Sequence, residues 1–239
     1  MTPKTLATFS AVLFDIDGTL VDSNEQHVRA WEAAFHRHGY EIPARVIRQQ
    51  IGKGGDQLVP SLVPGIGAQE AKAIADAHDT IFRAQHLDSV HPFTDAAELL
   101  ARVHDAGLKI ALASSSKREE VEHYIRLLDV EDLVDASTTG DDVDKSKPAG
   151  DLFACALTKL GAVPAGQALV IGDTPYDGIA ARVCGIAMIG VLSGGFEERE
   201  LLQAGAVEVY ANVSALLEAL GPADVRSVQP SSSTELHES

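Results

Sequence analysis

Residues 11–23 read Ala-Val-Leu-Phe-Asp-Ile-Asp-Gly-Thr-Leu-Val-Asp-Ser. The first four residues predict a buried strand, and two carboxylates follow it with one residue between them. In an extended chain, residues two apart project to the same side, so we expect Asp15 and Asp17 to point out together while Ile16 points into the core. Two like charges this close repel unless a positive charge lies between them. Gly18 permits a sharp turn after them, so the stretch predicts an acidic site at a strand end.

The composition restricts the class of protein. Of the 239 residues, 45% are hydrophobic and 23% are charged, as in an ordinary globular protein. The net charge of −16 argues against nucleic acid or an anionic membrane as a partner, because both are polyanions. A phosphorylated substrate remains compatible, since a bound divalent cation reverses the local field. Cys155 and Cys184 lie in apolar, helix-like surroundings and predict packed thiols in a reducing compartment. There is no signal-peptide pattern and no apolar run of bilayer length, so we expect a cytoplasmic protein.

The pattern along the chain predicts an α/β fold with a helical insertion. Strands alternate with helices from residue 92 onward, which is typical of a doubly wound parallel sheet that binds ligands at the carboxyl ends of its strands. We expect a core of residues 1–22 and 92–220, a helical insertion without strands at 23–91, and a disordered Ser- and Pro-rich tail at 221–239. After the first strand, the predicted strands are 109–113, 133–137, 168–171, 186–191 and 207–209.

A run of hydroxyl groups follows the predicted strand 109–113. Ser114 and Ser115 come directly before a helix N-terminus, where free N–H groups and a partial positive charge suit a phosphate. Ser116 with Glu119 fits a helix capping box, which accounts for Ser116 but not for the two serines before it. Ser114 and Ser115 are therefore candidate phosphate-binding residues.

A lysine and two further aspartates complete the candidate set. Lys147 precedes Pro148, which disfavours helical geometry at Lys147 and keeps it in a loop. Its ammonium could neutralise a phosphate oxygen and a carboxylate together. Asp173 ends another apolar strand, whereas Asp177 is predicted to complete a capping box with Thr174.

A magnesium ion prefers oxygen ligands. Asp15, the backbone carbonyl of Asp17, and Asp173 could supply three of them. The four stretches, in this order and each at a strand end, resemble the four motifs of the haloacid dehalogenase (HAD) superfamily. The resemblance implies a Rossmann-like HAD core with an all-helical cap at 23–91.

The resemblance also implies a reaction. Asp15 would attack phosphorus and become an aspartyl-phosphate, and Asp17 would protonate the leaving oxygen and then activate water. Ser114, Ser115 and Lys147 would hold the phosphoryl group while Mg²⁺ shields its charge. The implied function is a Mg²⁺-dependent phosphatase acting on a small phosphorylated metabolite, in the phosphoglycolate phosphatase-like branch.

Two residues of the insertion are candidates for substrate contact. His27 lies in a His-x-x-Ala-Trp element that resembles β-phosphoglucomutase-like members, but a histidine at a contact between cap and core explains it equally well. Lys53, in a glycine-rich turn, either reaches the non-reacting end of the substrate or is solvated. Ser23 with Gln26 is predicted to cap the first helix of the insertion.

Three other functions are compatible with parts of the pattern. A sugar phosphomutase of the β-phosphoglucomutase type is the main alternative. A phosphoaspartate receiver domain shares the clustered acids but would be about half this length and lack the insertion. A dehalogenase would need neither Mg²⁺ nor the carboxylates of Asp17 and Asp173. We expect a monomer or a homodimer.

Overall fold

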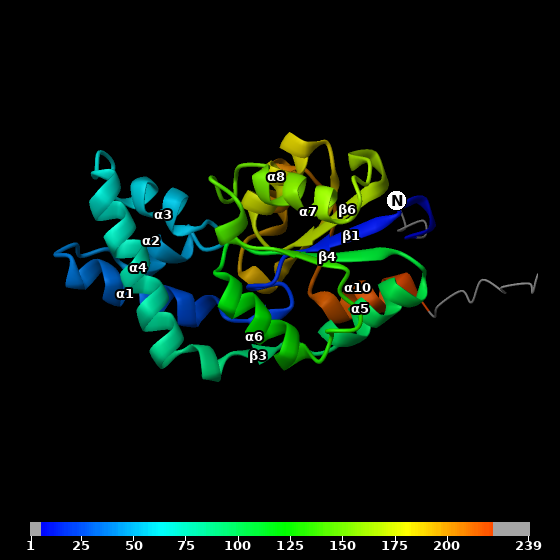
Figure 1. Cartoon of the computed structure of the whole chain (residues 1–239), viewed down its shortest axis with the longest axis horizontal. Helices are drawn as coiled ribbons and strands as arrows, with labels where there is room; N and C mark the ends of the chain where they lie inside the picture. The colour runs from blue at the N-terminus through cyan, green and yellow to red at the C-terminus, as the bar shows by residue number, and fades with distance from the viewer. Residues whose placement is uncertain (1–5, 222–239) are drawn as a thin grey trace, which may run out of the picture.

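The computed structural model describes residues 6–221. Six strands form one parallel sheet in the order β5-β4-β1-β6-β7-β8 (Figure 1). These strands are β1 (Ala11–Phe14), β4 (Lys109–Ala113), β5 (Ala136–Thr138), β6 (Ala168–Gly172), β7 (Ala187–Val191) and β8 (Ala206–Tyr210). The predicted α/β fold with a parallel sheet is confirmed.

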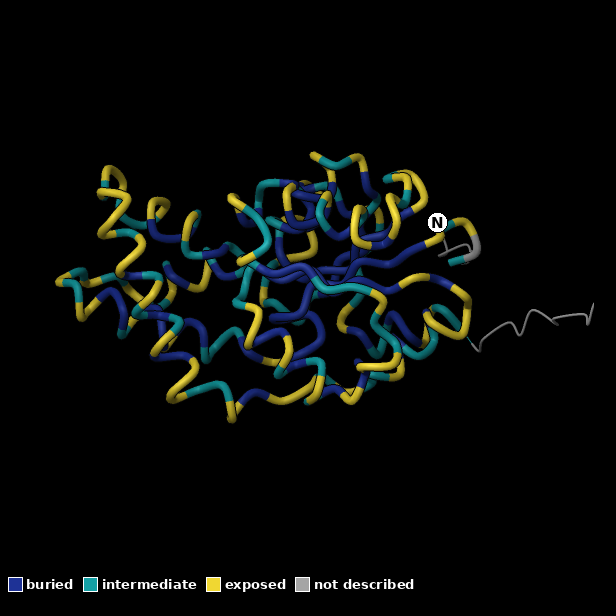
Figure 2. Tube along the Cα trace, in the orientation of Figure 1, coloured by how far each residue is buried: buried dark blue, intermediate teal, exposed yellow. Residues whose placement is uncertain are grey.

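Helices cover both faces of this sheet, and both cores are apolar. They are α5 (Ala96–Asp105), α6 (Arg118–Leu128), α7 (Asp151–Lys159), α8 (Pro175–Cys184), α9 (Glu198–Ala204) and α10 (Val213–Leu220). Strand β1 is fully buried and alternates between the two cores. Val12 and Phe14 pack with residues of α5, α6 and α10, whereas Leu13 packs with residues of α7, α8 and α9. Figure 2 shows the buried centre of the sheet. This burial on both faces explains the uncharged run that precedes Asp15.

The inserted helices lie beyond the carboxyl ends of the strands, at the left of Figure 1. They are α1 (Asn24–Arg37), α2 (Ala44–Arg48), α3 (Gly55–Leu62) and α4 (Ala68–Gln85). Trp31 and Phe35 of α1 are buried together with Phe82 of α4. Trp31 and Phe35 lie four residues apart, the spacing that predicts a helix with one buried face.

The structure adds a short strand pairing, which the sequence does not predict, at the two boundaries of the insertion. Strand β2 (Val21–Asp22) pairs antiparallel with β3 (His91–Pro92), so the two connections to the insertion are bonded to each other. A pairing of two residues leaves no alternation in the sequence. It arises because the chain leaves the core and returns to it at the same place.

One strand begins later than predicted, and the remaining differences are small. Strand β5 starts at Ala136, because the side chain of Asp135 accepts a hydrogen bond from the backbone N–H of Ile110 at 2.7 Å and occupies the place of a ladder bond. Short 3-10 helices span Leu6–Thr8, Leu87–Ser89, Gly140–Asp142, Ala165–Gln167 and Leu192–Gly194. The predicted disordered tail lies, after Gly221, outside the described residues.

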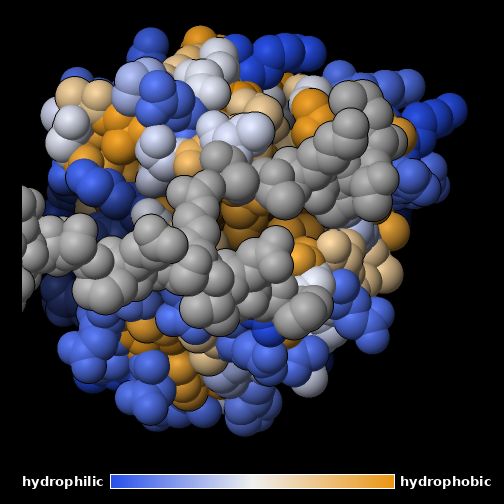
Figure 3. Space-filling model, turned by 90° about the vertical axis from the view of Figure 1, so that its right-hand side faces the viewer, coloured by the Kyte–Doolittle hydropathy of each residue, from blue (hydrophilic) through white to orange (hydrophobic). Residues whose placement is uncertain are grey.

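Figure 3 views the end of the core that lies opposite α1–α4, and its described surface mixes hydrophilic and hydrophobic residues. Within residues 6–221, every helix is too short or too polar to cross a membrane.

Candidate active site

Side chains from four separate segments meet at the carboxyl ends of the central strands. Asp15 follows β1, Ser114 follows β4, Asp173 follows β6, and Lys147 lies in the loop before α7. The ammonium Nζ of Lys147 forms ion pairs with Asp15 and, at 2.8 Å, with Asp177 Oδ1. Asp15 and Ser114 line the same cavity. The fold therefore brings together groups that lie up to about 160 residues apart in the chain, because parallel strands present their carboxyl ends at one edge.

The buried acidic cluster consists of Asp15, Asp173 and Asp177, whose carboxylate oxygens lie within 4.8 Å of one another. Burial raises the pKa of Asp15 to about 7; Asp177 and Asp17 add to the rise and Lys147 opposes it. Burial and the charges of Asp15 and Asp177 also raise the pKa of Asp173 well above its usual value. Burial lowers the pKa of Lys147, but the two carboxylates that it contacts raise it by more.

The acidic cluster fits a hard divalent cation. One lysine balances only part of the charge of three buried carboxylates. Burial first, and then repulsion among the carboxylates, raise the pKa values of Asp15 and Asp173. The donors are carboxylate oxygens, which suit Mg²⁺, and the nearby backbone offers further oxygens. The residues present therefore fit a magnesium ion.

Two glycines hold Asp173 closely. Gly18 has a φ of +82°, and a Cβ at this position would collide with Asp173 Oδ2. A Cβ at Gly194 would collide with the same oxygen. The hydroxyl of Thr19 donates a hydrogen bond to Asp173 Oδ1 at 2.8 Å. The carboxylate is therefore held from several sides, and neither glycine can take a side chain without displacing it.

Asp17 binds a different set of partners. Its Oδ1 accepts from the Ser23 hydroxyl at 2.7 Å and lies 3.0 Å from His27 Nε2, and its Oδ2 accepts from the hydroxyls of Ser114 at 3.0 Å and Ser116 at 2.9 Å. Burial alone would raise the pKa of Asp17. His27 and the hydrogen bonds lower it by more, so the pKa lies below its usual value. The structure does not place its carboxylate in the acidic cluster.

The contacts of Asp17 correct two predicted helix caps. Ser23 makes no capping hydrogen bond to α1, and the residue that caps α6 is Lys117 rather than Ser116. Both hydroxyls bind Asp17 instead, because a buried carboxylate needs donors more than an accessible helix end does. The capping box of Thr174 and Asp177 is confirmed.

A chain of hydrogen bonds continues from Asp17 into the inserted helices. His27 Nδ1 lies 3.2 Å from Nε2 of His78, and His78 Nδ1 lies 2.9 Å from Asp79 Oδ1. Burial and the adjacent His27 lower the pKa of His78 to about 4. Burial also lowers the pKa of His27, but Asp17 raises it by more, so its pKa is raised overall. Of the two histidines, His27 therefore holds a proton more readily than His78 does.

Residues 12–191 match the sequence model of the family described as haloacid dehalogenase-like hydrolase. The chain belongs to this family. The predicted membership of the HAD superfamily is confirmed, and with it the assignment as a hydrolase.

Individual HAD-like relatives agree with the family match. A phosphorylated carbohydrates phosphatase of Thermotoga maritima is 28% identical over 206 residues, which cover 82% of this chain and 92% of the relative. A pyrophosphatase, PpaX, of Bacillus velezensis is 25% identical over 182 residues, covering 76% and 82% respectively. The crystal structure of a hydrolase from Pseudomonas syringae is 32% identical, with a TM-score of 0.82 over 88% of this chain and 97% of that structure.

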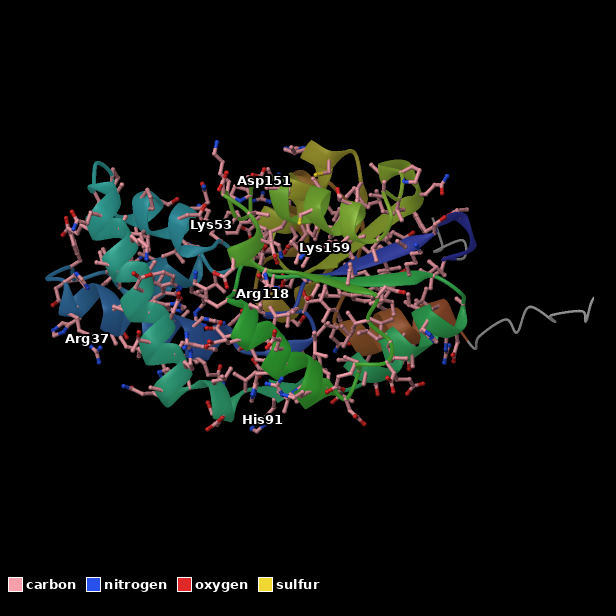
Figure 4. All side chains as sticks on the ribbon, viewed as in Figure 1. Arg37, Lys53, His91, Arg118, Asp151 and Lys159 are labelled. Atoms are coloured by element: carbon pink, nitrogen blue, oxygen red, sulfur yellow. The ribbon has the colours of Figure 1, made fainter. Side chains whose placement is uncertain are left out.

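The other candidates from the sequence lie at the edge of this HAD-like site. Lys53 lines the cavity, and its Nζ donates to Gln50 Oε1 at 2.6 Å and to the Ser61 hydroxyl at 3.0 Å. Figure 4 labels Lys53 at the junction between the inserted helices and the sheet. The Ser115 hydroxyl donates to the backbone carbonyl of Gly52 at 3.2 Å, so it links the core to the insertion.

Sequence reasoning missed His78 and Glu120. His78 lies on α4 and Glu120 in the first turn of α6, and both are buried and line the cavity. In the sequence, each residue is marked only by its position on the apolar face of a helix. That position predicts burial but not the side chains that the residue contacts. Burial raises the pKa of Glu120 to about 7; Asp17 and Asp79 add to the rise.

We expect Glu120→Gln to stabilise the metal-free protein at pH 8 and to have little effect near pH 4.5. The pKa of Glu120 is higher in the folded than in the unfolded state, so its stabilising contribution is present below the usual pKa and is lost as pH rises towards 7. Glutamine stays neutral at both pH values. The gain in the free energy of unfolding at pH 8 is on the order of 3 kcal/mol, because each unit of the rise in the pKa of Glu120 corresponds to about 1.4 kcal/mol.

Urea unfolding at the two pH values measures this effect. Glu122→Gln is the matched control, because Glu122 is exposed on the same helix. The interpretation is wrong if Glu120→Gln and Glu122→Gln show the same dependence on pH.

Proposed function

We propose that this HAD-like hydrolase is a Mg²⁺-dependent phosphatase, which hydrolyses a small phosphorylated metabolite through an aspartyl-phosphate on Asp15. The observation that carries the proposal is the buried Asp15 carboxylate, which contacts Lys147 and lies beside Asp173 in one acidic cluster. The names of the Thermotoga relative, a phosphorylated carbohydrates phosphatase, and of the Bacillus relative, a pyrophosphatase, support it.

The proposed reaction has two steps, and the first forms the phosphoenzyme. The Asp15 carboxylate attacks phosphorus, the bond between phosphorus and the leaving oxygen breaks, and that oxygen takes a proton from Asp17. His27 Nε2 lies 3.0 Å from Asp17 Oδ1 and can supply that proton to Asp17. A carboxylate nucleophile divides one difficult step into two easier ones.

The second step releases phosphate. Asp17 accepts a proton from a water molecule, whose oxygen attacks phosphorus and breaks the bond to Asp15. Phosphoryl transfer depends mainly on positioning and on charge neutralisation. Lys147 supplies a buried positive charge at Asp15, held there by Asp177. The hydroxyl of Ser114, with Ser115 beside it, is proposed to turn from Asp17 to the phosphoryl oxygens.

The carboxylates of Asp15 and Asp173 and the backbone carbonyl of Asp17 would hold Mg²⁺. When bound, the ion supplies positive charge that shields the phosphoryl oxygens. Asp177 supports the site through its ion pair with Lys147.

We also propose that the chain is divided into a catalytic core and a cap. We propose a core of residues 1–22 and 92–220 and a cap of residues 23–91 that closes over the site and excludes water. Helices α1 and α4 pack on each other, and the pairing of β2 with β3 joins the two connections. Lys53 and His27 are the proposed cap residues near the substrate.

The proposed partner is a single small phosphorylated metabolite. The net charge of −16 disfavours nucleic acid and anionic membranes. Both cysteines are free thiols, which suits the cytoplasm, and a monomer or homodimer is the proposed assembly.

A phosphomutase of the β-phosphoglucomutase type is the second candidate, favoured by the contact of His27 with Asp17. The two functions differ in the fate of the phosphoryl group. We expect incubation with glucose 1-phosphate, a catalytic amount of glucose 1,6-bisphosphate and Mg²⁺ to release inorganic phosphate without forming the isomeric sugar phosphate. Phosphorus NMR follows both products, and isomer formation without phosphate release would rule out the phosphatase.

A further inference from the structure

The cavity beside Asp15 has a volume of about 440 Å³ and an acidic lining. Asp15 and Asp17 are part of its lining. Five more carboxylates and three lysines line the remainder; the carboxylates are Asp56, Asp76, Asp79, Glu120 and Asp144, and the lysines are Lys53, Lys72 and Lys117. A leaving group that occupies this space meets more negative than positive charge.

The lysines of the lining are already bound to other groups. Lys72 Nζ lies 2.6 Å from Asp76 Oδ2, and Lys117 Nζ lies 3.0 Å from Asp141 Oδ1. Lys53 is held by Gln50 and a serine hydroxyl. A second anionic group on the substrate would therefore have to take a lysine from its present partner.

Glu120 differs from the other carboxylates of the lining. Its residue is 1% exposed, and its Oε1 has no hydrogen-bond partner among the described residues. The positive charge of Arg83 on α4 also acts on Glu120. However, the Arg83 guanidinium forms an ion pair with Glu119 at 2.7 Å. Buried polar groups are almost always hydrogen-bonded. Oε1 is sealed from solvent, but Glu120 lines the cavity, so a small rotation of its side chain makes the carboxylate an acceptor for a donor that enters the cavity.

Glu120 also lies close to where the leaving group must be. It lies four residues after Ser116, whose hydroxyl binds Asp17, and the charge of Glu120 acts on both Asp17 and His27. In the proposed mechanism, Asp17 protonates the leaving oxygen. A donor group a few bonds from that oxygen could therefore reach Glu120.

We infer that Glu120 binds the substrate by accepting a hydrogen bond from a donor group of the leaving alcohol. The substrate is then the phosphomonoester of a polyhydroxy alcohol or an amino alcohol, and not a molecule with a second anionic group. A hydroxyl and an ammonium share this donor chemistry, and the acidic lining accepts both. The inference rests on the proposed phosphatase function and specifies its substrate class.

Pairs of substrates that differ only in the donor group test the inference. Glycerol 1-phosphate and n-propyl phosphate have the same carbon chain with and without hydroxyls. Phosphoethanolamine and ethyl phosphate differ in an ammonium. For the full chain with Mg²⁺, we expect kcat/KM to be at least about 10-fold higher for the donor-bearing member of one pair, because a site with a buried polar group rejects analogues that leave it unpaired.

The Glu120→Ala variant should reduce that preference at least about 10-fold, whereas Glu122→Gln on the exposed face of the same helix should keep it. Glu120→Gln separates the two donors. Its amide oxygen still accepts from a hydroxyl, so a hydroxyl preference should persist in part, whereas an ammonium preference should be lost with the negative charge. Melting temperatures measured in parallel establish that each variant is folded.

Two outcomes would overturn the inference. The first is a preference that Glu120→Ala leaves within about twofold of wild type. The second is a wild-type protein that hydrolyses 2-phosphoglycolate or pyrophosphate, which carry a second anion, better than either donor-bearing substrate. Hydrolysis of p-nitrophenyl phosphate distinguishes a wrong substrate class from a wrong proposed function. If that activated ester is hydrolysed with Mg²⁺, only the substrate class is wrong, whereas an enzyme that releases no phosphate from any of these compounds is not a phosphatase.

Discussion

The Asp15→Asn variant is expected to lose phosphatase turnover by at least about 10³-fold while keeping its fold. An amide is nearly the same size as a carboxylate but does not attack phosphorus. Lys147 keeps its ion pair with Asp177 at 2.8 Å, so the buried ammonium is not left without a partner. Release of phosphate from p-nitrophenyl phosphate measures the rate, and circular dichroism measures the fold.

A matched control separates a loss of the nucleophile from a loss of charge. Asp105 is an exposed carboxylate at the end of α5, next to the amino end of β4 and far from the site, so Asp105→Asn should retain full activity. Wild-type protein quenched in acid during turnover should carry one phosphoryl group by intact mass, and Asp15→Asn should carry none. Residual activity above about one per cent of wild type would remove Asp15 from its proposed role.

Removal of magnesium has the second largest expected effect. A chelator should stop phosphate release, and added Mg²⁺ should restore it, because one lysine leaves the charge of the buried acidic cluster only partly balanced. Mg²⁺ should also raise the melting temperature of wild-type protein. The Asp173→Asn variant should lose most of that rise, since the proposed site then has one carboxylate fewer.

The magnesium effect should depend on pH in one direction. The pKa of Asp15 is raised to about 7 and that of Asp173 is raised as well, so Mg²⁺ must displace protons at low pH but not at high pH. The rise in melting temperature should therefore be larger near pH 8 than near pH 6. Equal rates with and without chelator, or a rise in melting temperature that Asp173→Asn retains, would contradict the proposed metal site.

The two misassigned serines show where sequence reasoning stops. Ser23 and Ser116 each fit a capping pattern, yet both hydroxyls bind Asp17. A capping box is a local motif of four residues. The competing acceptor comes from a segment 99 residues away in the case of Ser116. A pattern read within one helix contains no information about such a partner.

His78 and Glu120 are site residues that the sequence pattern does not identify. Each occupies the buried face of its helix, so helical spacing predicts burial but not chemistry. Only the packing of α4 and α6 around the cavity makes one of them a partner of His27 and leaves the other without a hydrogen bond on Oε1.

The order of strands and helices and the acidic strand ends at Asp15 and Asp173 follow from the sequence alone, because alternation, apolar runs and turn residues are local properties of the chain. The strand edge at which these ends meet follows from the parallel sheet that the alternation predicts. The tertiary structure alone decided which donors surround Asp17, where the β2–β3 pairing lies, and that Glu120 faces the cavity. Those features depend on contacts between segments far apart in the chain, and such contacts exist only once the inserted helices and the sheet have packed together.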